Sequence, residues 1–336
     1  MSAVFVMVGS VIGAGFASGK EIYIFFYGGN SFVSALLFFV LFFAAFFLIS
    51  VFAVRFGIYS SEKLFGRLYG RGRFAAELAL NFCYFLVLST MIAAANLCLS
   101  DLAGVDEKTG IFAILTATLA GAALSAGIKG VKIINAVAVP LIAVFMAAMC
   151  LGGQGAGGET KILSAAAYVC FNTVMMTGIL VNIAKNLTLK ENAAASLASA
   201  LILAALIWLV LARLNEPIYE YSPMPLISLA KSRGHWLYVA GTLVLYLSIL
   251  TTVLSVAYPL VQSLTPFFKN EKLCVWGVTA LAAVFSFAGF DAIIGWSYPV
   301  ISALGAVLLL SVGLKLLCGM PKKFFAKKIC AKQNGG

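Results

Sequence analysis

The stretch Gly9–Glu21 reads GSVIGAGFASGKE and lies inside the first apolar run of the chain, at about 3–26. Four of its residues are glycine, and each glycine disfavours a helix by roughly 1 kcal/mol relative to alanine. In hydrocarbon an unpaired backbone group is costly, so irregular backbone occurs at membrane depth only where protein or a water-filled cavity satisfies it. The stretch therefore predicts a membrane-spanning helix that is broken near its middle and lines a cavity.

The alternative explanation of these glycines is helix packing. Gly9/Gly13 and Gly15/Gly19 are spaced as GxxxG pairs, which let two membrane helices approach closely. Packing alone does not require the ionisable pair at positions 20 and 21 inside the same span. Broken helices form the substrate and ion sites of secondary transporters, so we favour the broken helix.

The composition assigns the chain to the membrane. Of its 336 residues, 62% are hydrophobic and 10% are charged, which is typical of an all-α polytopic membrane protein. The net charge of +11 comes from short loops and the C-terminal tail, so membrane topology explains it better than nucleic-acid binding does. Seven cysteines without a CxxC pair, together with a lone histidine, indicate neither a disulfide framework nor a metal cluster.

Ten apolar runs of about 20 residues predict ten transmembrane helices. They lie at about 3–26, 31–54, 74–99, 110–127, 133–151, 162–184, 193–211, 236–264, 273–287 and 293–317. Lysine and arginine concentrate after every second run, so the positive-inside rule places both termini in the cytoplasm and the chain in the cell membrane. The chain enters its first run directly, which favours a retained helix over a cleaved signal peptide.

Two connections have a composition of their own. GGQGAGGE at 152–159 is predicted to be a flexible loop. MPLISLAKSRG at 224–234 is predicted to contain a short helix that lies over the membrane surface.

Ten spans divide into five plus five, and because five is odd the second half would have inverted topology. The predicted units are a first repeat at 1–151, a second repeat at 152–318 and a basic cytoplasmic tail at 319–336. Span six should then carry a second break, around Phe171-Asn172-Thr173. Asn172 is costly at mid-membrane unless it faces partners in the bundle. The alternative is an asparagine that simply forms hydrogen bonds across helices.

A polar cluster in the eighth run, LSILTTVLS, points to an ion site. Ser248, Thr251 and Thr252 share one helix face and would present a carbonyl and two hydroxyls, the oxygen ligands that hard cations prefer. Carbonyls freed by the first break, at Gly9 and Ile12, would complete a sodium site without a carboxylate. The alternative is that these side chains bond to carbonyls of their own helix.

The two predicted breaks would form the substrate site. The half-helix that starts near Ala14 has unpaired N–H groups and a positive dipole end, which suit a carboxylate, and freed carbonyls around Asn172 suit an ammonium. Tyr84 lies near mid-depth in the third run and would cap the site, unless it only packs. The candidate substrate-binding residues are Gly13, Ala14, Gly15, Phe16, Tyr84, Phe171, Asn172 and Thr173.

Ionisable residues in the spans supply candidates for gating or proton coupling: Lys20, Glu21 and Glu77. A lysine as deep as Lys20 should pair with a carboxylate or reach an aqueous vestibule. Glu21 and Asp291 are expected near the outer side, as gates or interfacial charges. Glu77 is expected nearer the cytoplasmic end, and the alternative there is a snorkelling charge.

The first-span motif carries a resemblance. GSVIGAGFASGKE resembles the VIGAGFASGQE-type signature of the YkvI-like amino-acid permeases, which belong to the amino acid–polyamine–cation transporter superfamily with a LeuT-like five-plus-five fold. The resemblance covers the chain in span count and topology, and its specific motif is confined to span one. It implies an amino-acid substrate only loosely, and Lys20 stands where the signature has glutamine.

A second resemblance concerns sodium. GSVIGAG looks like the GNAVGLG stretch of the sodium-coupled LeuT relatives, which implies Gly9 and Ile12 as carbonyl ligands. The spacing of Ser248, Thr251 and Thr252 is similar to the sodium site on span eight of that fold.

These features predict a secondary active transporter of a small solute, an amino acid or a related amine, coupled to sodium by alternating access. Its partners would be the solute and the lipid bilayer, with no nucleic acid and no cofactor other than the sodium ion. One alternative is a proton-coupled or uncoupled permease of the same fold, and another is a non-transporting nutrient receptor. A channel or an enzyme is disfavoured, because the spans show no ring-forming polar repeat and no nucleophile–base arrangement.

Overall fold

The computed structural model describes residues 3–126, 129–216, 222–268 and 270–318, with backbone alone at 126 and 129–139. The predicted basic tail at 319–336 lies outside the described residues. Within them the chain is helical, with one isolated β-bridge between Gly29 and Gly158.

The helices coincide with the predicted apolar runs, apart from two additional short ones, α5 and α11. They are α1 (Ala3–Val11), α2 (Ala14–Ala17), α3 (Lys20–Phe26), α4 (Ser31–Phe56), α5 (Ser61–Tyr69), α6 (Arg73–Ala103), α7 (Ile111–Ala126), α8 (Lys129–Cys150), α9 (Ile162–Ile183), α10 (Leu189–Leu214), α11 (Pro225–Arg233), α12 (His235–Phe268), α13 (Glu271–Ser286) and α14 (Phe290–Cys318). Six helical segments of the described chain are long and apolar enough to cross a membrane. The full number of ten crossings stays a prediction, because α7 and α13 have 16 residues each and the first run is divided.

The first span consists of three short helices. Helix α1 ends at Val11, and the amide of Gly13 donates to the Val11 carbonyl at 2.7 Å instead of to the Gly9 carbonyl that a continuing α-helix would use. Gly13 itself is extended. A second turn follows at Gly19, whose φ of +78° is left-handed and favours glycine. The interruption therefore lies within the glycine-rich stretch.

The sixth span is not broken, so that part of the fold prediction is wrong. Helix α9 runs without interruption from Ile162 to Ile183. The side chains of Asn172 and Thr173 donate to carbonyls of their own helix, those of Tyr168 at 3.0 Å and Val169 at 2.7 Å. The polar groups that suggested a break thus find partners on an intact helix, as Ser, Thr and Asn often do.

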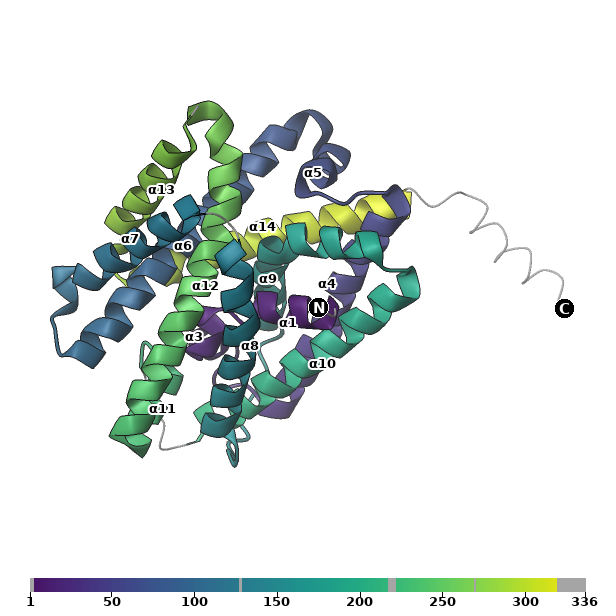
Figure 1. Cartoon of the computed structure of the whole chain (residues 1–336). Helices are drawn as coiled ribbons and strands as arrows, with labels where there is room; N and C mark the ends of the chain where they lie inside the picture. Colours follow the sequence, from purple (N-terminus) through teal and green to yellow (C-terminus); the bar gives the residue numbers. More distant parts are fainter. Residues whose placement is uncertain (1–2, 127–128, 217–221, 269, 319–336) are drawn as a thin grey trace, which may run out of the picture.

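The divided first span lies in the middle of the molecule (Figure 1). Helix α1 contacts α9 and α10, α2 contacts α8 and α12, and α3 contacts α9 and α10. The longer helices thus surround the three short ones, and backbone groups at the two turns face protein.

Helix α4 has one face buried in the bundle and another face exposed. Phe38, Phe42 and Phe46 are fully buried at helical spacing. Phe32 and Leu36, on the opposite face, are exposed. A row of exposed large apolar side chains marks an interaction surface, and on a helix of this length and hydropathy that surface suits lipid.

Helix α11 forms where the sequence predicts a short helix, but its first turn lies against the broken span. The amide of Leu226 donates to the Ser18 carbonyl at 3.0 Å, and Pro225 and Leu226 are buried. A Cβ at Gly19 would lie 3.0 Å from the Leu226 side chain and 3.3 Å from Pro225. The glycine therefore permits both the left-handed turn and the close approach of α11.

The glycine segment, Gly152–Glu159, joins the two halves of the chain and is not the flexible loop that its composition predicts. Gly158 N donates to Gly28 O at 2.8 Å, and Ser31 N donates to Ala156 O at 2.9 Å. These bonds attach the segment to the turn between α3 and α4, so it has a defined position.

The same segment is attached to the end of α10. Gly155 N donates to Ala212 O at 2.7 Å. Asn215 completes the contact, because its amide accepts from Gly28 N at 3.0 Å and donates to Gly29 O and Ser31 Oγ at 2.9 Å each. The segment therefore connects the turn before α4 with the end of α10.

Close packing explains the glycines of this segment. A Cβ at Gly153 or Gly155 would overlap the backbone at the end of α10, and a Cβ at Gly157 would overlap Gly29 O. Side chains are excluded there because two backbones approach each other directly.

Candidate functional site

The break in the first span meets α12 at Thr252. The amide of Ala14, the first residue of α2, donates to Thr252 Oγ1 at 3.2 Å. A Cβ at Gly13 would lie 3.1 Å from the same oxygen. Glycine at position 13 thus lets α12 reach the backbone of the break, and the threonine hydroxyl caps one of the unpaired amides at the start of α2.

Three oxygens converge on this junction from α12. Thr251 Oγ1 and Thr252 Oγ1 both donate to the Ser248 carbonyl, at 2.8 and 2.9 Å. The hydroxyl of Ser248 is buried and has no hydrogen-bond partner among the described residues. Both threonines thus bond to their own helix, as the alternative explanation expects, and the Thr252 hydroxyl also contacts the break.

The five predicted sodium ligands come from the two sides of this junction. Ile12 lies in the break, and Gly9 lies in the last turn of α1. The Gly9 carbonyl does not accept the Gly13 amide, as it would in a continuing α-helix, because that amide donates to the Val11 carbonyl. Ser248, Thr251 and Thr252 lie on α12. Among the described residues there is no cluster of three or more His, Cys, Asp or Glu side chains that could hold a metal ion, so an ion here would rely on neutral oxygens.

Glu21 is a buried ionisable group that lies against the α2 segment of the break. It lies in the first turn of α3, and its side chain turns back so that a Cβ at Gly15 would overlap the carboxylate. Tyr168 of α9 donates to Oε2 at 2.9 Å, and Tyr298 of α14 donates to Oε1 at 3.5 Å. The sequence places Glu21 near the outer side as an interfacial or gating charge, whereas the structure buries it among α2, α9 and α14.

Aromatic rings surround the Glu21 carboxylate. Phe25 lies one helical turn further along α3, with its ring 5.0 Å from that of Tyr168 and 6.0 Å from that of Tyr298. The Phe171 ring lies 4.6 Å from the Tyr298 ring. Phe171, a predicted substrate residue, therefore belongs to this cluster, which supplies only two hydroxyls as polar partners.

Lys20 points away from Glu21 and forms an ion pair across the bundle. Its Nζ lies 2.7 Å from Oδ1 of Asp291 in the first turn of α14. The lysine side chain is 4% exposed and the aspartate side chain 44% exposed. The expectation that a lysine at this depth pairs with a carboxylate is confirmed.

The other predicted substrate residues lie in different surroundings. Gly13, Ala14, Gly15 and Phe16 form or flank α2, where Ala14 and Phe16 are buried. Asn172 and Thr173 bond to their own helix. Tyr84 is buried in α6, and no hydrogen bond joins it to the described residues of the break.

Glu77 lies away from the junction, on the surface at the start of α6. Its Oε1 is 3.3 Å from Arg73 Nε, and Arg73 also pairs with Glu62 of α5 at 3.2 Å. The glutamate thus belongs to an interfacial ion-pair cluster.

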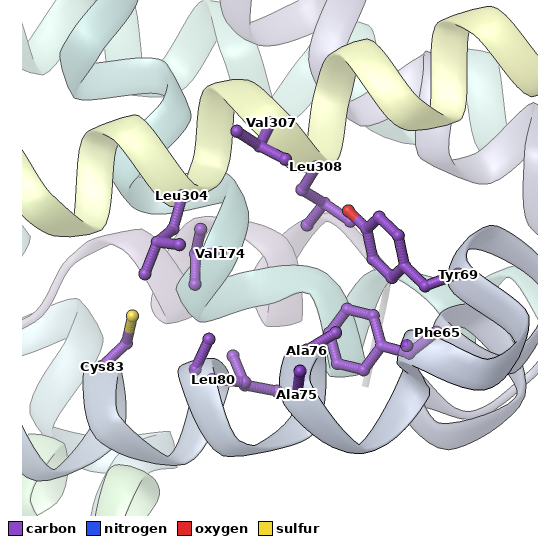
Figure 2. Close-up of a pocket in the computed structure, with 12 residues that line it drawn as sticks. Phe65, Tyr69, Ala75, Ala76, Leu80, Cys83, Val174, Leu304, Val307 and Leu308 are labelled. Carbon is purple, nitrogen blue, oxygen red and sulfur yellow. The ribbon is translucent and has the colours of Figure 1, made fainter.

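An apolar cavity of about 380 Å³ lies between α5, α6, α9 and α14 (Figure 2). It reaches from Phe65 and Tyr69 on α5 along the small residues of α6 to Cys83, opposite Leu304 and Leu308 of α14. None of the predicted site residues lines it, although Cys83 precedes Tyr84. The cavity is therefore separate from the junction at Thr252.

Sequence reasoning missed two residues of the site, Tyr168 and Tyr298, which contact Glu21. It named Asp291 as a gate or interfacial charge but not as the partner of Lys20. The available signal was a tyrosine hydroxyl inside each of two apolar runs, since a buried Tyr O–H usually has a polar partner. Which partner it has depends on the fold.

Comparison with known proteins gives relatives along the whole chain. No protein-family model matches. The protein YyaD of Bacillus subtilis (strain 168), which is uncharacterized, is 25% identical over 329 aligned positions, covering 92% of this chain and 94% of the relative. The uncharacterized membrane protein YkvI of the same organism is 24% identical over 347 aligned positions, covering 95% and 96%.

Two solved structures share the fold. MhsT in complex with L-phenylalanine superposes with a TM-score of 0.67 at 15% identity, covering 96% of this chain and 89% of MhsT. Mhp1, a nucleobase-cation-symport-1 family transporter in a closed conformation with bromovinylhydantoin bound, gives a TM-score of 0.57 at 14% identity, covering 93% and 74%. None of these names is that of an enzyme, in line with the expectation from the sequence. The chain is thus similar along its length to YkvI, a membrane protein, and it is a multi-pass membrane protein that shares the LeuT-type fold of MhsT and Mhp1.

Proposed function

We propose that this protein is a secondary transporter that carries a small solute across the cell membrane by alternating access, with sodium bound between the first span and α12. The observation that carries the proposal is the bond from Ala14 N to Thr252 Oγ1, because it joins the interrupted backbone of one helix to the hydroxyl cluster of another. An ion at that junction would favour the arrangement in which the two helices touch.

The donor set suits sodium. The Ser248 carbonyl and the hydroxyls of Thr251 and Thr252 would provide three neutral oxygens on α12, and the Gly9 and Ile12 carbonyls two more from the break. Hard cations prefer oxygen ligands. Rotation of the two hydroxyl hydrogens away from the Ser248 carbonyl would free the lone pairs of that carbonyl for an ion, and the hydroxyl oxygens would bind the ion through lone pairs of their own.

The proposed solute is an amino acid or a related amine. MhsT is known with L-phenylalanine and Mhp1 with a hydantoin, and both ligands are small molecules with polar groups and an apolar part. In this chain a carboxylate would bind beside the start of α2, where it would compete with Thr252 Oγ1 for the Ala14 amide, and Phe171 would provide an aromatic wall. The ammonium contact expected on α9 is withdrawn, because the Tyr168 and Val169 carbonyls are already bonded.

Two inverted five-helix repeats, at 1–151 and 152–318, belong to the proposal. Counterpart helices would be α4 and α10, α6 and α12, α7 and α13, and α1 and α9, and each of these pairs is in contact. Contact between equivalent elements is what a two-fold axis produces. Alternating access would then be a rocking of spans one, two, six and seven against the rest, with both termini in the cytoplasm.

The test is the thermal stability of the purified protein in detergent, with sodium or with choline, across amino acids and small amines. A ligand that binds the folded state raises the melting temperature by mass action. We expect sodium, but not choline, to raise the melting temperature and to increase the further rise that one solute produces. The response to sodium should be retained in Thr252→Ser and lost in Thr252→Val. Thr265→Val is the matched control, because Thr265 makes the same bond to its own helix elsewhere on α12. An equal sodium response in Thr252→Val and wild type would exclude this ion site.

A proton-coupled permease of the same fold is the second candidate, and the buried carboxylate of Glu21 favours it. Flux through reconstituted vesicles that follows pH and ignores sodium would identify it. Specific solute binding without any flux would instead identify a nutrient receptor.

A further inference from the structure

We propose that Glu21 is a proton-binding site, so that its side chain is a neutral carboxylic acid in the closed arrangement of the break and gives up the proton when water enters. The inference rests on the proposed transport function only for the last step, the exchange with water. Its first part concerns the folded protein alone.

The first observation is that Glu21 is buried without a cationic partner in contact. It is 6% exposed, and its hydrogen-bond partners among the described residues are two tyrosine hydroxyls. Lys20, the adjacent residue, directs its ammonium to Asp291 at 2.7 Å. An ionised carboxylate loses its hydration on burial, and two neutral hydroxyls compensate for only part of that loss.

The second observation is the composition of the surroundings. Titratable side chains on the elements around Glu21 are Lys20 and Tyr23 of α3, Tyr27 directly after it, Tyr168 and Cys170 of α9, and Asp291 and Tyr298 of α14, whose Lys315 and Cys318 lie at its other end. Helix α2 has none, the charged residues of α10 lie at its two ends, and Lys231 of α11 pairs with Asp101. Tyr23 and Tyr27 stack on each other at 4.4 Å between ring centroids. Among these described groups, Lys20 is the only cation near Glu21, and it faces the other carboxylate.

The third observation is that the carboxyl group fits tightly. Its Oε1 lies against Gly15, where even a Cβ would overlap it. Phe25 and Phe171 fill the adjoining space with apolar rings. The compact fit leaves a proton as the occupant that this arrangement accommodates, and it disfavours an organic cation bound next to the carboxylate.

The geometry also assigns the proton to one oxygen. Tyr168 donates to Oε2 at 2.9 Å, so Oε2 acts as the carbonyl oxygen of the acid. The proton of the acid would then lie on Oε1, and the 3.5 Å contact in which Tyr298 donates to the ionised carboxylate would reverse, with Oε1 donating to the Tyr298 hydroxyl oxygen. When the break opens, water takes the proton as hydronium and leaves a carboxylate on Glu21, which balances atoms and charge.

The position of Glu21 connects this step to movement. The residue is in the first turn of α3, directly after the left-handed turn at Gly19, and its carboxyl group touches α2. Separation of α2 from α3 would expose the carboxyl group, and ionisation would then favour the open arrangement. A proton would thus enter or leave at each opening and closing of the break.

The test is infrared spectroscopy of the purified full chain in lipid nanodiscs at neutral pH, because a protonated carboxyl group has a C=O stretching band that a carboxylate lacks. We expect the band in wild type, its loss in Glu21→Gln and its retention in Glu77→Gln, which changes a surface carboxylate. Tyr168→Phe should keep the band and shift its frequency, because it removes the hydrogen bond to Oε2. Absence of the band from wild type, or its persistence in Glu21→Gln, would overturn the inference.

A second measurement, the melting temperature as a function of pH, tests the inference independently of the infrared band. It also distinguishes the proton site from the sodium site. The wild-type melting temperature should fall as pH rises, because a group that holds its proton more tightly when folded loses its stabilising contribution with increasing pH. Glu21→Gln should weaken the pH dependence of the melting temperature and keep its response to sodium. Thr252→Val should keep the pH dependence and lose the response to sodium. A sodium response with no acid band would refute only the proton site, whereas an acid band with no sodium or solute response would refute only the proposed transport coupling.

Discussion

The ammonium of Lys20 and the carboxylate of Asp291 join two helices that are 271 positions apart in the chain, and they do so asymmetrically. The lysine side chain is buried and the aspartate side chain is half exposed. Loss of one partner therefore has different consequences on the two sides, because only the lysine charge would remain in a dry environment.

The first prediction follows from that asymmetry. Asp291→Asn should destabilise the protein more than Lys20→Met does, by up to about 3 kcal/mol, since it removes an anionic partner of a buried charge, whereas Lys20→Met leaves a charge that is half exposed to solvent. The double variant should recover part of the loss. Thermal unfolding in detergent measures all three, and Lys231→Met is the control because its pair with Asp101 is exposed on both sides. Equal effects of the two single variants would contradict the prediction.

The second prediction concerns pH and Glu107, in the connection before α7. Partial burial, followed by the negative charges of Asp291 and Asp106, raises the pKa of Glu107 above its ordinary value of 4.5. A raised folded-state pKa means that the favourable contribution is present in acid and is lost as pH rises through that pKa. Glu107→Gln should therefore raise the melting temperature near neutral pH and leave it unchanged at pH values below the ordinary pKa. A variant that is stabilised equally at all pH values would refute this electrostatic explanation.

The third prediction tests the contact between the break and α12. Gly13→Ala places a methyl group 3.1 Å from Thr252 Oγ1, so it should cost about 1–3 kcal/mol through overpacking. Thr252→Ala should relieve the clash, and a double-mutant cycle should show a coupling of at least about 0.5 kcal/mol. Gly178→Ala is the control, because a Cβ there meets nothing within 4 Å. Additive effects in the cycle would show that the two residues do not touch.

The fourth prediction concerns the glycine segment. Gly152 and Gly157 both have left-handed φ, +84° and +70°, but only Gly157 lies against another backbone. Both alanine variants carry a conformational cost of about 1–2 kcal/mol, and Gly157→Ala adds the overlap with Gly29 O. Its melting temperature should fall well below that of Gly152→Ala. Similar melting temperatures for the two variants would mean that the segment moves to accommodate the added methyl group at little cost.

The long helices could be predicted from the sequence because a run of apolar residues is a local property of the chain. Runs of about 20 apolar residues located the long helices to within a few positions, and the four glycines located the interruption of the first span. In both cases the residues that decide the structure are neighbours in the chain.

The errors concern the partners of polar groups. Asn172 and Thr173 have the composition of a break, and only the fold shows that they bond to their own helix. Glu21 is expected near the outer side as a gate or an interfacial charge, and only the fold shows that its carboxyl group is buried against Gly15. Tyr298 and Asp291 lie 277 and 271 positions from their partners Glu21 and Lys20. A single sequence contains no signal for contacts between residues so far apart in the chain.

The glycine segment has a practical consequence for handling the protein. A connection of small residues halfway along the chain looks like the natural place to insert a fluorescent tag, to introduce a protease site or to express the two halves as separate fragments, since exposed loop tips usually tolerate such changes. Here both its amides and its carbonyls are used by neighbouring backbone, and there is no room for a side chain at three of its positions. Reporters are better placed at the turn around Gly57, where a Cβ meets nothing within 4 Å, because an insertion at the midpoint would separate α10 from the turn before α4.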